Sequence, residues 1–135
     1  MDYGDRNLNE WGLGAQMADG TLNFVPAGGD VVDVRQLATN EACAQCHDNL
    51  IAHGRRHSLE LCIMCHYPGV IDPDTGNSVD MPVMAHKIHM GNKLTNGYTI
   101  VGFGGAAFDF TEVTYPQDQR YCDTCHVAEA AQSEL

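Results

Sequence analysis

Short apolar runs broken by turn-forming residues predict that this chain folds into short elements rather than long ones. The first two runs, Thr21–Val25 and Val31–Val34, are strand-like, and the turn-forming segment Pro26–Gly29 separates them. The region that holds these runs contains no cysteine or histidine. We therefore expect two parts, an extended or β-rich lead-in over residues 1–38 and a separate domain over residues 39–135.

Capping signals predict two short helices in the first half of this domain. Thr39 or Asn40 is suited to cap the first helix, which should carry Cys43, Cys46 and His47 on one face. A short polar side chain at the cap accepts a hydrogen bond from the exposed backbone of the first turn. Ser58 is suited to the same role in a second helix over residues 58–66. Glu60 would place a negative charge near the positive end of that helix.

The second half of the domain alternates loops with regular elements. Residues 68–79 hold two prolines and two glycines and predict a loop. A third helix should begin after Asp80 and stop at Gly91. Residues 98–115 are rich in β-branched and aromatic side chains and suggest a β-hairpin, and a last helix is expected from about residue 117. The predicted fold is mostly irregular, with short α-helices and a short hairpin.

All six cysteines fall into three Cys-x-x-Cys-His motifs, the signature of haem attachment. Two residues between the thiols let one helical turn reach both vinyl groups of a porphyrin, and the adjacent histidine then points at the iron. The motifs are Cys43, Cys46 and His47; Cys62, Cys65 and His66; and Cys122, Cys125 and His126. Because they use every cysteine in the chain, we predict three covalently attached c-type haems.

Three other uses of paired cysteines fit the pattern less well. A disulfide framework has no reason to place a histidine directly after each pair. A thioredoxin-like redox site would need a βαβ pattern, which the sequence lacks, and would not need three copies. A structural zinc site takes two such pairs in a closed tetrahedron, whereas this chain has three pairs and three adjacent histidines.

Four histidines outside the motifs are candidates for the second ligand of each iron, namely His53, His57, His86 and His89. His86 and His89 lie three residues apart on the third predicted helix, so they project from one side and could serve two different haems. His53 is the third candidate, which leaves His57 as the spare. The methionines of the same helix are an alternative source of ligands that we assign to packing.

Three haems would supply most of the hydrophobic core. The chain has one Trp, four Phe and five Tyr, but fourteen Gly. Fifteen residues separate Cys46 from Cys62, so the first two porphyrins must lie close together. We therefore expect the chain to be largely unfolded without haem.

The net charge of -11 argues against nucleic acid as a partner, because phosphates are bound by Lys and Arg. No apolar run is long enough to span a bilayer. The start of the chain lacks the cationic and apolar leader that directs export, whereas c-type haem is attached outside the cytoplasm. We therefore expect an exported protein whose leader is missing from this sequence.

Four stretches resemble the outer-surface multihaem cytochromes of the OmcA/MtrC type. They are NEACAQCH, HGRRHSLELCIMCHYPG, DPDTGNSVDMPVMAHKIHMG and YPQDQRYCDTCH, and together they extend from about residue 39 to residue 126. In the family pattern, the HG histidine and both histidines of the HKIH segment look like ligand positions. The resemblance therefore implies that His53, His86 and His89 are distal ligands and that His57 has no assigned role.

The resemblance also implies a function and a location. It implies closely stacked bis-histidine haems that receive electrons from partner cytochromes and pass them to metal oxides or flavin-like shuttles. The location would be the periplasm or the outer surface of a Gram-negative bacterium. No catalytic residue is assigned, because an electron carrier needs none.

Two alternatives stay open at this point. An enzyme, a terminal reductase for a metal ion or oxyanion, would need one haem with an open coordination position. A subunit of a filament would use His57 to ligate a haem of its neighbour, which would make self-association part of the function. Family members also carry more haems and flanking domains, so this chain is either a small relative or a piece of a larger protein.

Overall fold

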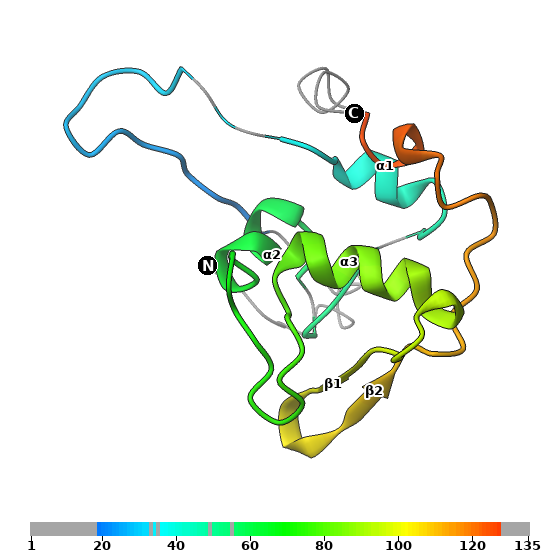
Figure 1. Cartoon of the computed structure of the whole chain (residues 1–135). Helices are drawn as coiled ribbons and strands as arrows, with labels where there is room; N and C mark the ends of the chain where they lie inside the picture. The colour runs from blue at the N-terminus through cyan, green and yellow to red at the C-terminus, as the bar shows by residue number, and fades with distance from the viewer. Residues whose placement is uncertain (1–18, 33, 35, 49, 55, 128–135) are drawn as a thin grey trace, which may run out of the picture. The chain divides into compact units, whose positions relative to one another are not determined.

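The computed structural model describes residues 19–32, 34, 36–48, 50–54 and 56–127. This part of the chain is mostly irregular, with short helices and a two-stranded antiparallel hairpin, as the sequence predicted (Figure 1). The regular elements are α1 (Asn40–Ala44), α2 (Leu59–Cys65), α3 (Met81–Met90), β1 (Thr99–Val101) and β2 (Ala107–Asp109). The chain divides into two compact units, one of residues 1–62 and 123–135 and the other of residues 63–122.

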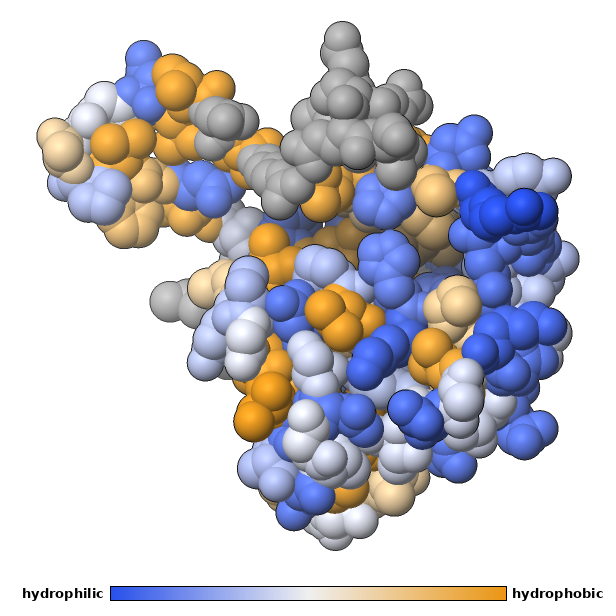
Figure 2. Space-filling model, in the orientation of Figure 1, coloured by the Kyte–Doolittle hydropathy of each residue, from blue (hydrophilic) through white to orange (hydrophobic). Residues whose placement is uncertain are grey.

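The first described segment, residues 19–32, runs without a strand (Figure 1). The described residues of the two predicted strands, 21–25 and 31–34, form no strand. Between them the Gly28 N–H donates a hydrogen bond to the Val25 carbonyl (2.9 Å) and closes a turn. An extended run becomes a strand only when a neighbouring strand completes its hydrogen bonds. Leu22 and Phe24 are 85% and 71% exposed. Figure 2 shows hydrophobic residues on the surface of this segment.

Helix α1 begins where the sequence predicted but ends earlier. The Thr39 hydroxyl caps it by accepting a hydrogen bond from the Ala42 N–H at 3.2 Å. The N–H groups of Cys46 and His47 both donate to the Cys43 carbonyl, at 3.2 and 2.9 Å, which closes a turn after the helix. The prediction that a helix carries the whole first motif is therefore wrong, because only Cys43 is helical.

Helix α2 matches its prediction closely. The Ser58 hydroxyl accepts a hydrogen bond from the Leu61 N–H (3.3 Å) and donates to Glu60 Oε2 (2.7 Å). The Leu59 N–H donates to the side-chain oxygen of Asn40 at 3.0 Å. This last bond ties the first turn of α2 to the first turn of α1, so the segments that carry the first two motifs are held together.

The second unit is built on α3 and the hairpin (Figure 1). Pro82 lies in the first turn of α3 and Gly91 ends it, as predicted. The strands pair antiparallel, with Ile100 opposite Phe108. Among the described hydrophobic residues of this unit, Tyr98 alone is fully buried; its hydroxyl donates to the Ser78 carbonyl at 2.7 Å and its ring stacks on Phe110.

A buried carboxylate connects the predicted loop to the hairpin. Asp72 accepts hydrogen bonds from the Val101 N–H at 2.8 Å and from the Thr75 hydroxyl at 2.5 Å. The Thr75 hydroxyl and the Val101 backbone hold the pKa of the Asp72 carboxyl below its usual value, because both favour the charged form. Asp72 therefore acts as the anchor of this loop.

The last predicted helix is not formed as far as the structure describes the chain. Cys122–Thr124 is a single 3₁₀ turn, and the continuation over residues 128–135 lies outside the described residues. Asp118 accepts hydrogen bonds from both the backbone and the guanidinium of Arg120. The turn that these hydrogen bonds close competes with the start of a helix, which explains why the predicted helix does not form.

Candidate haem sites

One cysteine from each motif lies in the first unit close to the others. Burial raises the pKa of the Cys43 thiol, and the thiols of Cys125 and Cys62 raise it further through their charge. Cys43 therefore lies within electrostatic range of Cys62 and Cys125, which come from the other two motifs. Among the described residues, no three His, Cys, Asp or Glu side chains converge on a single point where a bare metal ion would bind.

The other motif residues are distributed over the ends of short elements. Cys46 and His47 follow α1, Cys65 ends α2, and Cys122 opens the last 3₁₀ turn. The side chains of the three motif cysteines Cys46, Cys65 and Cys122 are exposed. Exposed thiols are accessible to the enzymes and haem that form thioether bonds.

Three of the predicted ligand histidines share one hydrogen-bond arrangement. The Nδ1–H of His66 donates to the Val79 carbonyl at 2.6 Å, and on α3 the Nδ1–H groups of His86 and His89 donate to the carbonyls of Pro82 and Ala85, at 2.6 and 2.7 Å. A carbonyl oxygen can only accept, so Nδ1 carries the proton and the lone pair of each neutral ring lies on Nε2. This is the tautomer and the second contact that histidines bound to metals have.

His89 has two further neighbours that the sequence analysis missed. The ring of Tyr115 meets the His89 ring edge-on, with 5.6 Å between centroids and an angle of 83°. The Gln119 Nε2 donates to the His89 carbonyl at 3.0 Å. The only sequence signal for Tyr115 and Gln119 is that both lie in the stretch YPQDQRYCDTCH, which resembles the family and leads into the third motif.

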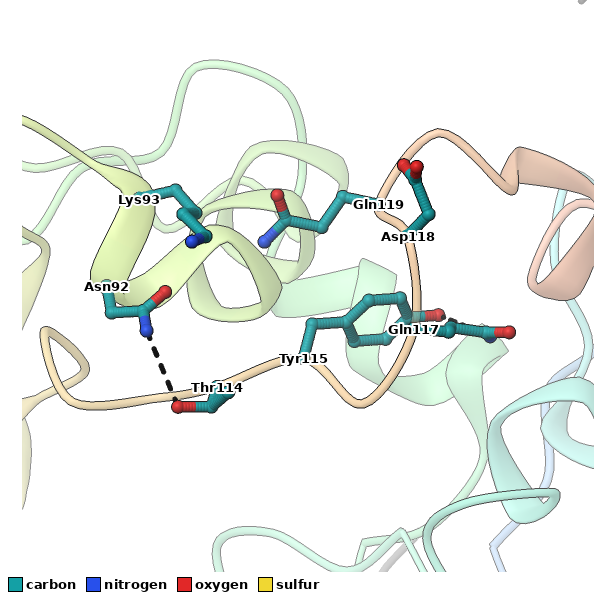
Figure 3. A pocket seen from close by; sticks show the side chains of 7 residues that line it. All are labelled: Asn92, Lys93, Thr114, Tyr115, Gln117, Asp118 and Gln119. Carbon is teal, nitrogen blue, oxygen red and sulfur yellow. Dashed lines mark hydrogen bonds between the residues drawn. The ribbon is translucent and has the colours of Figure 1, made fainter.

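Tyr115 and Gln119 also line a cavity of about 340 Å³. Figure 3 shows the side chains of Lys93 and Gln119 pointing toward one another across it, with the Tyr115 ring as part of the wall. The Asn92 amide donates to the Thr114 hydroxyl at 3.5 Å. The wall is polar apart from the Tyr115 ring, so the cavity admits water.

His53 lies at the tip of a tight turn and has a strained backbone. Ala52 and Arg56 form both backbone hydrogen bonds of a bridge, each at 3.0 Å, and Arg56 also donates to the His53 carbonyl at 3.2 Å. His53 has φ of 48° and is followed by Gly54 with φ of 86°. A left-handed backbone at a residue other than glycine costs on the order of 1–3 kcal/mol and is typical of functional sites.

His57, which the sequence left without a role, is bound to the lead-in segment. Its Nε2 lies 3.3 Å from Asp19 Oδ1, and its backbone N–H donates to Asp19 Oδ2 at 3.0 Å. The Ser58 N–H donates to the same oxygen at 2.9 Å. His57 and Asp19 therefore fix the start of α2 to a segment that lies 38 residues earlier.

The part of the polypeptide that the structure describes lacks a hydrophobic core of ordinary size. Among the described hydrophobic residues, only Ala42 and Tyr98 are buried. Large side chains within and directly after the second motif are exposed, namely Ile63, Met64 and Tyr67. A large apolar group bound at the motifs would cover such side chains, and the anchored histidines would be suited to ligate its iron, so the residues present fit haem.

Comparisons with known proteins agree with this geometry. The sequence model of the family described as outer membrane cytochrome MtrC/MtrF-like, domains II/IV, matches residues 35–135. The crystal structure of the outer membrane decaheme cytochrome OmcA matches with a TM-score of 0.73 and 30% sequence identity, over 85% of this chain. The chain covers 19% of that OmcA chain. No curated protein sequence matches.

Proposed function

The chain belongs to the family of outer membrane cytochromes similar to MtrC and MtrF, and from this premise we propose that it transfers electrons through three bis-histidine c-type haems. Membership of this family places it among exported haem proteins of the outer membrane of Gram-negative bacteria. The part of the chain that the structure describes has no helix long and apolar enough to cross a bilayer. The number of haems, their ligands and their redox partners belong to the proposal.

The proposed haem sites combine covalent attachment with two histidines for each iron. The three Cys-x-x-Cys-His motifs would each hold one haem, with the motif histidine as one ligand. His53, His86 and His89 would supply the other ligands, one to each iron. We propose residues 39–135 as the three-haem domain and residues 1–38 as a lead-in to it.

The observation that carries the proposal is the anchoring of His66, His86 and His89 by backbone carbonyls. Each carbonyl fixes the tautomer with its lone pair on Nε2 and restricts rotation of the ring. A bound c-type haem supplies a one-electron iron couple, and two histidine ligands leave no coordination position for a substrate. The arrangement therefore favours an electron carrier over a reductase with an open haem.

His57 is left out of the proposed ligand set because its ring already has a partner in its own chain. Its Nε2 lies next to the Asp19 carboxylate. A filament bridged by His57 would have to break this pair. We therefore propose that His57 is structural.

The proposed electron donors are partner cytochromes, and the proposed acceptors are extracellular metal oxides or flavin-like shuttles. The net charge of -11 favours partners that present a basic surface. Partners of this kind should bind less tightly as the salt concentration rises, because salt screens the attraction between exposed charges.

Counting the haems and identifying their ligands test the proposal. A pyridine haemochrome assay should give three haems per chain, and electron paramagnetic resonance of the oxidised protein should show only low-spin iron. Replacing His53, His86 or His89 by alanine should each convert one haem to high spin, whereas His57→Ala should leave all haems low-spin. Fewer than three haems, or a high-spin haem in the unaltered protein, would contradict the proposal.

A further inference from the structure

We propose that Tyr115 and Gln119 are positioning residues for His89, and that they set the reduction potential of the haem that His89 ligates. This inference rests on the proposed function, because it assumes that His89 is a haem ligand. It goes beyond that function by assigning a role to two side chains that no haem-attachment motif includes.

Gln119 holds the backbone of His89. His89 lies in the last turn of α3, where the final carbonyl groups have no partner within the helix. The Gln119 amide donates to the His89 carbonyl at 3.0 Å from 30 residues further along the chain. The bond therefore fixes the end of the helix at the residue whose side chain must meet the iron.

Tyr115 holds the ring of His89. The Nδ1–H bond to the Ala85 carbonyl fixes one edge of the imidazole, at 2.7 Å. The edge-on contact with Tyr115, at 5.6 Å and 83°, restricts the tilt of the ring from another side. The two contacts together limit rotation of the imidazole about its Cβ–Cγ bond.

The segment that carries these two side chains is itself anchored to the end of α3. The Asn92 N–H donates to the Val113 carbonyl at 3.0 Å. Gly91 lies so close to Val113 that a Cβ atom built on it would collide with the Val113 carbonyl oxygen. Tyr115 therefore follows a fixed point of the backbone, and its contact with His89 is held in place.

The cavity of about 340 Å³ gives the Tyr115 ring a second effect. The ring contacts His89, and Tyr115 also lines this cavity together with Lys93 and Gln119 (Figure 3). Without the ring, water from this polar cavity would reach the imidazole. Ligand orientation and solvent access are two ways in which a protein tunes the potential of a haem.

The experiment uses the haem-loaded full chain and follows each haem by electron paramagnetic resonance and by potentiometric titration. Tyr115→Leu removes the ring, and Gln119→Met removes the hydrogen-bond donor at similar length. We expect each variant to keep three low-spin haems but to shift the g values and the midpoint potential of one haem. Tyr115→Phe keeps the ring and should resemble the unaltered protein, and Gln119→Asn keeps an uncharged amide donor and should shift the potential less than Gln119→Met.

The outcomes separate this inference from the proposed function. If His89→Ala leaves all haems low-spin, His89 is not a ligand and both proposals fail. If His89→Ala gives one high-spin haem but Tyr115→Leu and Gln119→Met leave every g value and potential unchanged, only the positioning role fails. A shift of all three haems together would also overturn it, since that indicates general loosening. If Tyr115→Leu loses haem, the comparison of Gln119→Met with Gln119→Asn decides, because neither substitution changes the charge.

Discussion

Asp19 binds both the backbone and the ring of His57. This contact joins the lead-in segment to the start of α2. One carboxylate oxygen accepts the His57 N–H at 3.0 Å and the Ser58 N–H at 2.9 Å, and the other lies 3.3 Å from the His57 Nε2. The Asp19 side chain is only 7% exposed. The contact with Asp19 in the same chain therefore accounts for the role of His57.

Replacing Asp19 by asparagine should lower the free energy of unfolding by roughly 1–3 kcal/mol, because hydrogen bonds to a buried charged group are lost. Denaturation of the haem-loaded protein, followed by the visible haem spectrum, measures this change. Asp30→Asn removes an exposed carboxylate from the same segment and should have little effect. Equal effects of the two substitutions would show that the Asp19 contact does not stabilise the fold.

The effect of Asp19→Asn should depend on pH. Burial raises the pKa of Asp19, but the hydrogen bonds from the His57 and Ser58 backbone and the charge of His57 outweigh it and bring the pKa below its ordinary value of 3.8. The stabilisation is therefore fully present above pH 3.8 and is lost as the pH falls through the lower, folded pKa.

The unfolding free energies of the unaltered protein and of Asp19→Asn should thus differ at neutral pH and converge in acid. Denaturation curves recorded at a series of pH values check this. A difference that stays constant down to the most acidic pH would contradict the assigned pKa direction.

Gly91→Ala should destabilise the protein more than Gly76→Ala. Both glycines have a positive φ, 32° and 74°, but a Cβ at Gly91 would collide with Val113, whereas nothing lies within 4 Å of one at Gly76. The strained backbone alone costs roughly 1 kcal/mol at either position, and the collision adds about 1–3 kcal/mol at Gly91. Thermal unfolding of the two variants gives the difference directly, and equal losses would show that the end of α3 can move away from Val113.

The chain made without haem should be largely unfolded. Its described part buries only Ala42 and Tyr98 among hydrophobic residues, which is too little apolar surface to offset the entropy of ordering the chain. Circular dichroism and proton spectra of the protein produced without haem attachment should show an unstructured chain, with the haem-loaded protein as the control. A cooperative unfolding transition of the haem-free chain would show that the polypeptide has a core of its own.

Several elements could be predicted because their causes are local. Thr39, Ser58 and Gly91 mark helix ends through their own backbone and side-chain chemistry, and α1, α2 and α3 begin or end beside them. The hairpin was predicted from β-branched and aromatic residues around glycines, and it forms between β1 and β2. The last predicted helix failed because the Asp118–Arg120 interaction closes a turn that composition does not reveal.

The sequence by itself was enough to predict haem attachment, since covalent attachment depends on thiols and a histidine at fixed spacing within one turn of chain. Only the tertiary structure decided which distant residues contact the histidines. The partner of His57 lies 38 residues away, and the partner of the His89 carbonyl lies 30 residues away. Such contacts depend on how distant segments pack, and packing follows from the whole chain rather than from any local pattern.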